Sequence, residues 1–117
     1  MRHHEKFKTL GREKNQRTAL VRSLMRSLVL HGGITTTETK AKELRKYIEP
    51  LVTKAKSGTL ASRRLVISAI GDDKAAKKLV DVIAKEQKSR NGGYTRVVKL
   101  PLRKTDAAKM AHIQFVK

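Results

Sequence analysis

The chain has 117 residues, of which 28 are Lys or Arg and 10 are Asp or Glu, so its formal net charge is +18. A chain of this length supports one modest hydrophobic core, which excludes a multidomain enzyme. The absence of cysteine excludes disulfides, thiolate metal sites and thiol nucleophiles, and it favours the cytoplasm as the compartment. No apolar run exceeds three residues, whereas a membrane span needs roughly twenty.

The surplus of positive charge indicates the class of partner, because crowded cations repel one another and favour a ligand that supplies negative charge. Hydrophobic residues make up 38% of the chain and charged residues 32%, which is too apolar for a disordered tail and too basic for an ordinary soluble enzyme. We therefore expect a folded domain that binds nucleic acid. A domain that binds anionic lipid, or that is merely kept soluble by its charge, is the plainer alternative.

Residues 1–16 combine scattered apolar side chains, which follow no period, with five basic ones. Such a segment buries too little apolar area to order by itself, so we expect an extended basic arm that its partner orders. A terminus without a role is the alternative, but cations spaced in this way suit a phosphate backbone. The chain then divides into an arm, 1–16, and a single domain, 17–117.

Two long amphipathic helices are predicted after the arm. Apolar residues at offsets 0, 1, 4, 5 and 8 from Leu20 indicate a helix over about 17–31, which ends at Gly32. A second helix, over about 38–56, has an apolar stripe that continues across Pro50, and we expect the proline to kink it. Thr37 is expected to cap this helix through its hydroxyl group.

Two shorter helices and a small sheet complete the predicted domain. Leu60, Leu65, Val66, Ala69 and Ile70 indicate a third helix that ends at Gly71. A fourth begins at Asp72 or Asp73 and directs Ala76, Leu79, Val80 and Ile83 inward. A short strand is expected at 34–36, and strands at 94–100 and 110–116 form a hairpin. The fold class is therefore α+β, with about four helices packed on a small antiparallel sheet.

Groups that catalysis or metal binding would require are sparse. The acids are scattered, and Glu38 and Asp72 stand where helix N-termini favour negative charge. His3-His4 has no further ligand at a suitable spacing. Gly92-Gly93 precedes a strand, unlike phosphate-binding loops that open a helix, and is either a simple turn or a place where a ligand approaches the backbone. We expect no enzyme activity, no cofactor, no metal and no small-molecule substrate.

The four aromatic residues form no cluster in the sequence, so a base-stacking platform is not expected. Alternation along 110–116 places Ala111, Ile113 and Phe115 on one face, which makes Phe115 a core residue. Phe7, in the arm, is the aromatic residue that could insert into a nucleic acid. Recognition should therefore depend on phosphate, sugar and the shape of the nucleic acid.

The segment at residues 34–56, ITTTETKAKELRKYIEPLVTKAK, resembles the signature of the bacterial large-subunit ribosomal protein seventeen family. Met1-Arg2-His3, the block Gly92-Gly93-Tyr94-Thr95-Arg96 and the tail around Arg103, Asp106 and Met110-Ala111 are similar to the same family. The resemblance covers nearly the whole chain. It implies a structural protein of the large ribosomal subunit, with large-subunit (23S-type) rRNA and neighbouring ribosomal proteins as partners, located in the cytoplasm and independent of membranes.

The resemblance implies that the arm, the Lys40-Ala41-Lys42 corner and the Gly92–Arg96 block face rRNA, and charge adds the polar faces of the first two helices and the basic loops. The candidate rRNA-binding residues are Arg2, His3, Lys6, Lys8, Arg12, Lys14, Arg17, Arg22, Arg26, Lys40, Lys42, Arg45, Lys46, Arg90, Gly92, Gly93, Tyr94, Arg96, Arg103 and Lys104. A DNA-binding architectural protein is the main alternative, although no apolar wedge is evident beyond Phe7. A small ribonuclease, which needs a histidine and an acid or base in one cleft, is a third.

Overall fold

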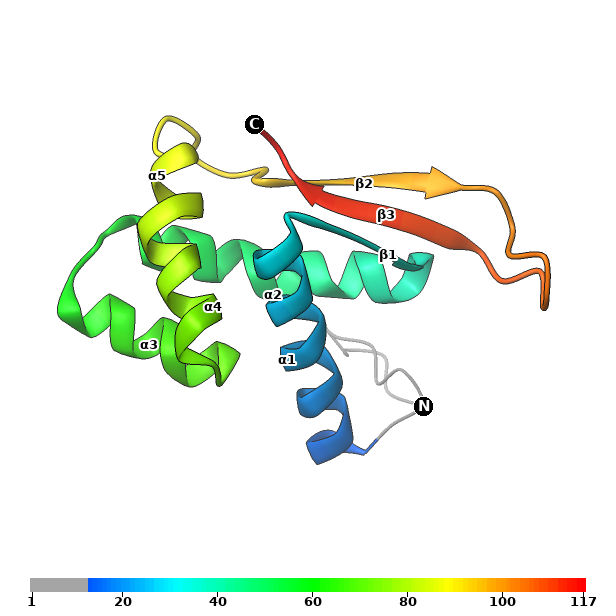
Figure 1. The fold of residues 1–117 in the computed structure, drawn as a ribbon, viewed down its shortest axis with the longest axis horizontal. Helices are drawn as coiled ribbons and strands as arrows, with labels where there is room; N and C mark the ends of the chain where they lie inside the picture. Colours follow the sequence, from blue (N-terminus) through cyan, green and yellow to red (C-terminus); the bar gives the residue numbers. More distant parts are fainter. Residues whose placement is uncertain (1–12) are drawn as a thin grey trace, which may run out of the picture.

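The computed structural model describes residues 13–117, and the predictions for the arm at 1–12 lie outside this range. Helices and strands follow in the predicted order, and the α+β fold class is confirmed (Figure 1). The elements are α1 (Lys14–His31), β1 (Gly33–Thr37), α2 (Glu38–Lys56), α3 (Leu60–Ile70), α4 (Asp73–Lys78), the π-helical turn η1 (Leu79–Ile83), α5 (Ala84–Glu86), β2 (Thr95–Leu100) and β3 (Met110–Phe115).

Helix α1 begins three residues earlier than predicted, so Lys14 belongs to the helix and the proposed arm boundary at Gln16 falls inside it. The first turn is exposed and therefore has no apolar periodicity that could mark it. Val21, Met25 and Leu28 are buried as predicted. Gly32, in the left-handed conformation with φ 79°, closes the helix by donating its N–H to the Leu28 carbonyl.

Helix α2 forms the centre of the core and has the predicted bounds. Its apolar stripe is buried along its whole length, and the helix continues through Pro50. The predicted hydroxyl cap at Thr37 is wrong, because Thr37 lies in β1 and its side chain makes no capping hydrogen bond. The N–H of Glu38 donates instead to the Lys109 carbonyl at 2.9 Å, so the hairpin supplies the acceptor that the first turn lacks.

Helix α3 presents less apolar surface to the core than the sequence indicates. Val66 and Ile70 are buried, but Leu60 and Leu65 are 64% and 53% exposed, which corrects the predicted stripe. Val66 and Ile70 lie four residues apart on one face of the helix, and the partly buried Ile67 and Ala69 also pack against the core. Gly71 ends the helix as predicted, with φ 74°.

The predicted fourth helix is one helical run made of α4, η1 and α5. Asp72 caps it by accepting a hydrogen bond from the N–H of Ala75, as expected of an aspartate in this position. The predicted inward residues Ala76, Leu79, Val80 and Ile83 are buried. The π-helical turn within the run was not predicted, since an apolar period of 3.6 residues does not distinguish it.

The sheet has the strand order β1-β3-β2, and both pairs are antiparallel. Ile34 pairs with Ile113, which pairs with Val97, and these side chains therefore lie on one face of the sheet. Helix α2 lies against this face (Figure 1). No helix of the described chain covers the other face, and the loop at 101–109 extends away from the helices (Figure 1).

Candidate nucleic-acid interface

A groove between α1 and α2 brings together several of the predicted basic residues. Lys14, Arg17 and Arg22 of α1 face Lys46 and Lys54 of α2 across a space of about 510 Å³. No acidic side chain of the described chain lines it. The groove therefore offers converging cations to an anion. Lys54 was not among the predicted residues, because only the packing of α2 against α1 reveals its position.

Arg22 is held in place at one end of this groove. Its Nη2 donates to the Ser68 carbonyl of α3 at 3.3 Å, so the side chain bridges two helices. Arg26, one turn further along α1, is half-buried. The structure thus places the two predicted arginines on one side of α1 and fixes the first of them.

The predicted Lys40-Ala41-Lys42 corner is not one surface. Ala41 is fully buried, and side chains two residues apart point to different sides of a helix. Lys42 pairs with Glu38 at 2.8 Å, and Lys99 lies 3.7 Å from the same carboxylate. The hydrogen bond from Lys42, together with the charges of Lys42 and Lys99, lowers the pKa of Glu38. This acid therefore offsets part of the local positive charge.

Arg45 and Lys46 lie on the exposed side of α2. With Lys42, Glu49 and Pro50 they line a shallow hollow. Lys46 also pairs with the buried Glu43 at 2.9 Å. Lys42, Arg45 and Lys46, three of the four predicted cations of α2, thus lie together with the acid Glu49, a feature that the residue types alone did not show.

The loop between α5 and β2 is anchored at its base. Lys56 donates to the Arg90 carbonyl and, at 3.2 Å, to the Tyr94 hydroxyl, and its Nζ lies 5.0 Å from the centre of the Tyr94 ring. Arg90 Nη2 donates to the Lys117 main-chain oxygen at 3.2 Å. Gly92 and Gly93 are exposed. The tip is therefore presented to solvent from a fixed base.

Tyr94 itself belongs to the core, since its side chain is 1% exposed. Hydrogen bonds from Thr53 and Lys56 lower the pKa of its phenol, while burial opposes this shift. Its side chain offers no surface to an RNA. We therefore leave Tyr94 out of the proposed interface as a contact and regard it as an anchor for Gly92 and Gly93.

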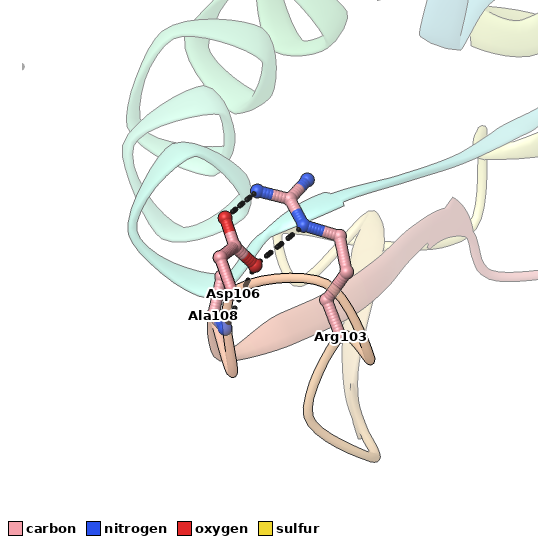
Figure 2. Close-up of polar contacts among 3 residues, drawn as sticks. All are labelled: Arg103, Asp106 and Ala108. Atoms are coloured by element: carbon pink, nitrogen blue, oxygen red, sulfur yellow. Dashed lines mark hydrogen bonds and ion pairs between the residues drawn. The ribbon is translucent and has the colours of Figure 1, made fainter.

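The loop of the β2–β3 hairpin carries a fixed arginine. Arg103 donates from Nε and Nη2 to the two oxygens of Asp106, at 2.9 and 2.7 Å, and Asp106 Oδ1 also accepts the Ala108 N–H at 3.2 Å (Figure 2). The Arg103 side chain and the Ala108 N–H lower the pKa of Asp106 to about 2. Lys104 is exposed beside them. The loop therefore holds the Arg103 guanidinium in a two-pronged ion pair and leaves Lys104 exposed.

The uncovered sheet face carries residues that were not predicted. His112, His31 and Lys117 line a groove there together with the predicted Arg96. The alternation that placed Ile113 inward could have shown that His112 faces outward. Arg2, His3, Lys6, Lys8 and Arg12 lie outside the described residues.

Several acids within residues 13–117 have structural contacts and lie apart from one another. Asp81 pairs with Arg63 at 2.9 Å, Asp72 caps a helix, and Glu49 accepts hydrogen bonds from the N–H and hydroxyl of Thr95. No group of three His, Asp or Glu side chains in this range could hold a metal ion. Within the same range, every helix is too short or too polar to cross a membrane.

Fixed arginines, cationic grooves and a small α+β body are typical of the class of basic proteins that bind polyanions. A family model described as Ribosomal protein L17 matches residues 20–116. The chain belongs to the ribosomal protein L17 family, a family of structural ribosomal proteins. This membership confirms the resemblance inferred from the sequence.

The relatives match over nearly the whole chain. Large ribosomal subunit protein bL17 of Sphingopyxis alaskensis is 51% identical over 116 residues, which cover 99% of this chain and 84% of that protein. The protein of the same name from Campylobacter jejuni is 47% identical and covers 99% of both chains. That of Rickettsia bellii is 50% identical, with 99% and 82% covered.

Proposed function

We propose that this chain is a non-catalytic, structural constituent of the large ribosomal subunit in the cytoplasm, where it binds large-subunit (23S-type) rRNA and contacts neighbouring ribosomal proteins. The observation that carries the proposal is family membership over almost the entire chain, together with relatives whose names place them in that subunit. The net charge of +18 supplies the physical reason for the RNA partner.

Charge neutralisation is the proposed mechanism. Each lysine or arginine that meets a phosphate releases counterions, so binding strengthens as salt falls. The proposed contacts are the groove cations Lys14, Arg17, Arg22 and Lys46, the α2 residues Lys42 and Arg45 of the shallow hollow, Lys40 elsewhere on α2, the loop at Arg90, Gly92 and Gly93, Arg26, Arg96 and the hairpin pair Arg103 and Lys104, together with the arm residues Arg2, His3, Lys6, Lys8 and Arg12. Arginine serves as a two-pronged donor and lysine as a point charge.

The alternatives receive less support. A ribonuclease needs a histidine beside an acid or base, but His112 contacts the Thr35 hydroxyl, and Asp81 and Glu49 are engaged with Arg63 and Thr95. A DNA-binding architectural protein remains testable by direct competition. In competition with a labelled rRNA transcript, unlabelled transcript should displace the protein at a much lower concentration than duplex DNA does.

Sedimentation tests the proposal. The tagged protein, expressed in a bacterium, should travel with the large subunit in a sucrose gradient and stay bound through a moderate salt wash. A double variant that removes two groove cations, Lys14→Gln with Arg17→Gln, should be released at lower salt than the wild type. The matched control, Lys74→Gln with Lys77→Gln, removes two exposed cations from α4. If the wild-type protein stays at the top of the gradient, the proposed function is wrong.

A further inference from the structure

The uncovered face of the sheet is hollowed at the end where α1 meets β1. The hollow has a volume of about 620 Å³ and is lined by His31, Gly32, Gly33, Arg96, His112, Gln114, Phe115, Val116 and Lys117. Sites for ligands of moderate size have volumes of a few hundred to about a thousand Å³. The hollow is therefore larger than a single phosphate needs and suits one or two nucleotides.

The strand register explains why these residues share the hollow. Arg96 pairs with Gln114, which pairs with Gly33, and His112 pairs with Thr35. Directly paired residues lie on the same face of a sheet, so these side chains all lie on the face opposite Ile113. Arg96 of β2 therefore stands across β3 from β1, and the other basic side chains of the hollow are His31 at the end of α1, His112 of β3 and Lys117 beyond β3.

His112 is fixed in this hollow. Its Nδ1 is 3.0 Å from the Thr35 hydroxyl, and its Nε2 lies above Gly33, where an added Cβ would stand only 2.8 Å away. A side chain at position 33 would collide with the ring, so the glycine leaves room for the imidazole beside β1. The Thr35 contact occupies one ring nitrogen and leaves Nε2 for a ligand.

The lining of the hollow favours an anion. It includes Arg96, Lys117 and two histidines, and no Asp or Glu side chain of residues 13–117 takes part. Arginine and histidine also have flat faces on which bases stack. A surface with cations, flat side chains and hydrogen-bonding groups such as Gln114 matches the backbone and bases of unpaired RNA better than it matches a simple anion.

We propose that this hollow is a binding site for one or two unpaired nucleotides of RNA, in which Arg96 and Lys117 contact phosphate and His112 donates or accepts a hydrogen bond through Nε2. This inference rests on the proposed function and deepens it, because it assigns a particular RNA element to a particular face. It adds His31, Gly33, His112 and Lys117 to the interface.

Nuclear magnetic resonance on the full chain tests the site with a mixed-sequence RNA hexamer as probe. The ring signal of His112, assigned by its loss in His112→Asn, should shift saturably as the hexamer is added. Arg96→Gln should weaken hexamer binding about tenfold, as the loss of one charge-assisted hydrogen bond implies. Arg64→Gln removes an exposed arginine from α3 and should bind as the wild type does. Inorganic phosphate at the same concentration should shift the signal much less.

The outcomes separate the two proposals. If an rRNA transcript binds the wild type but Arg96→Gln weakens the hexamer no more than Arg64→Gln, the nucleotide site is wrong and the proposed function stands. A shift of equal size with inorganic phosphate also overturns the nucleotide site, since the hollow then binds only a simple anion. If the wild type binds neither the transcript nor the hexamer at low salt, both proposals fail.

Discussion

Replacing Gly92 and Gly93 separately with alanine distinguishes two reasons for a glycine in the exposed loop. One is a backbone conformation that only glycine adopts easily, and the other is close approach of RNA to the backbone. Gly93 has φ +62°, whereas Gly92 does not lie in the left-handed region, and an added Cβ meets nothing within 4 Å at either position. The left-handed conformation costs a residue with a Cβ about 1–2 kcal/mol. Where the backbone conformation suits alanine, replacing glycine with alanine stabilises the folded state by about 0.4–1 kcal/mol, because it reduces the conformational entropy of the unfolded chain. Gly93→Ala should therefore lower the free energy of unfolding by about 1 kcal/mol, and Gly92→Ala should not lower it.

Urea unfolding measures this difference directly. For a urea dependence of about 2 kcal/mol per molar, the midpoint of Gly93→Ala should fall by about 0.5 M and that of Gly92→Ala should stay the same or rise. Equal midpoints for the two variants would refute the reasoning from φ. The control is Gly58→Ala, because Gly58 also has a positive φ, +68°, and open space around it, and it should behave like Gly93→Ala.

Binding gives the second half of the same prediction. If an rRNA backbone approaches Gly92 closely, the added methyl group should weaken binding about tenfold although the fold is intact, as overpacking of a tight contact does. Filter binding with an rRNA transcript measures this. Unchanged affinity in Gly92→Ala would show that the glycine pair serves the turn alone.

Three further predictions follow from ion pairs and packing. The Asp106 carboxyl should titrate near pH 2, as measured by NMR. The stabilisation of the hairpin loop is therefore fully present above the ordinary pKa of 3.8 and is lost as the pH falls through about 2. In Arg103→Gln the pKa of Asp106 should return toward 3.8. Lys40→Ala with Lys42→Ala should reduce the log–log salt slope of rRNA binding by up to about 1.4 if both residues neutralise single-strand phosphates, and an unchanged slope rejects the pair. Ile113→Ala, at a fully buried position, should lower the free energy of unfolding by about 2–5 kcal/mol in urea, and a loss below 1 kcal/mol would contradict its central place.

The fold could be predicted wherever burial and backbone chemistry leave a local pattern. The stripe of α2, the glycines that end α1 and α3, and the hairpin all follow from apolar spacing or from a required conformation. The first turn of α1 is exposed and carries no such pattern. Leu60 and Leu65 were misassigned because an apolar side chain in the sequence does not show which part of a short helix reaches the core.

The sequence predicted which residue types form the candidate interface, but it did not predict how they are grouped in space. Composition identified the cations, yet their grouping depends on which helices pack together, so the meeting of Lys14 with Lys54 required the tertiary structure. The pairing of Lys42 with Glu38 was readable from their spacing of four residues. Burial of Tyr94 was not, because a tyrosine beside a strand suits either a surface or a core.

The position of β3 has a consequence for how the chain reaches its structure. Both β1 and β2 bond to β3 alone, and the pairing of Thr35 with His112 joins residues 77 positions apart. Contacts between such distant segments form late, since a long loop must close before they are made. During synthesis the helices can therefore pack together early, while the edge of β1 stays exposed until β3 has been made. Deleting residues 110–115 would leave β1 and β2 without a partner strand and would produce a partly folded, aggregation-prone species.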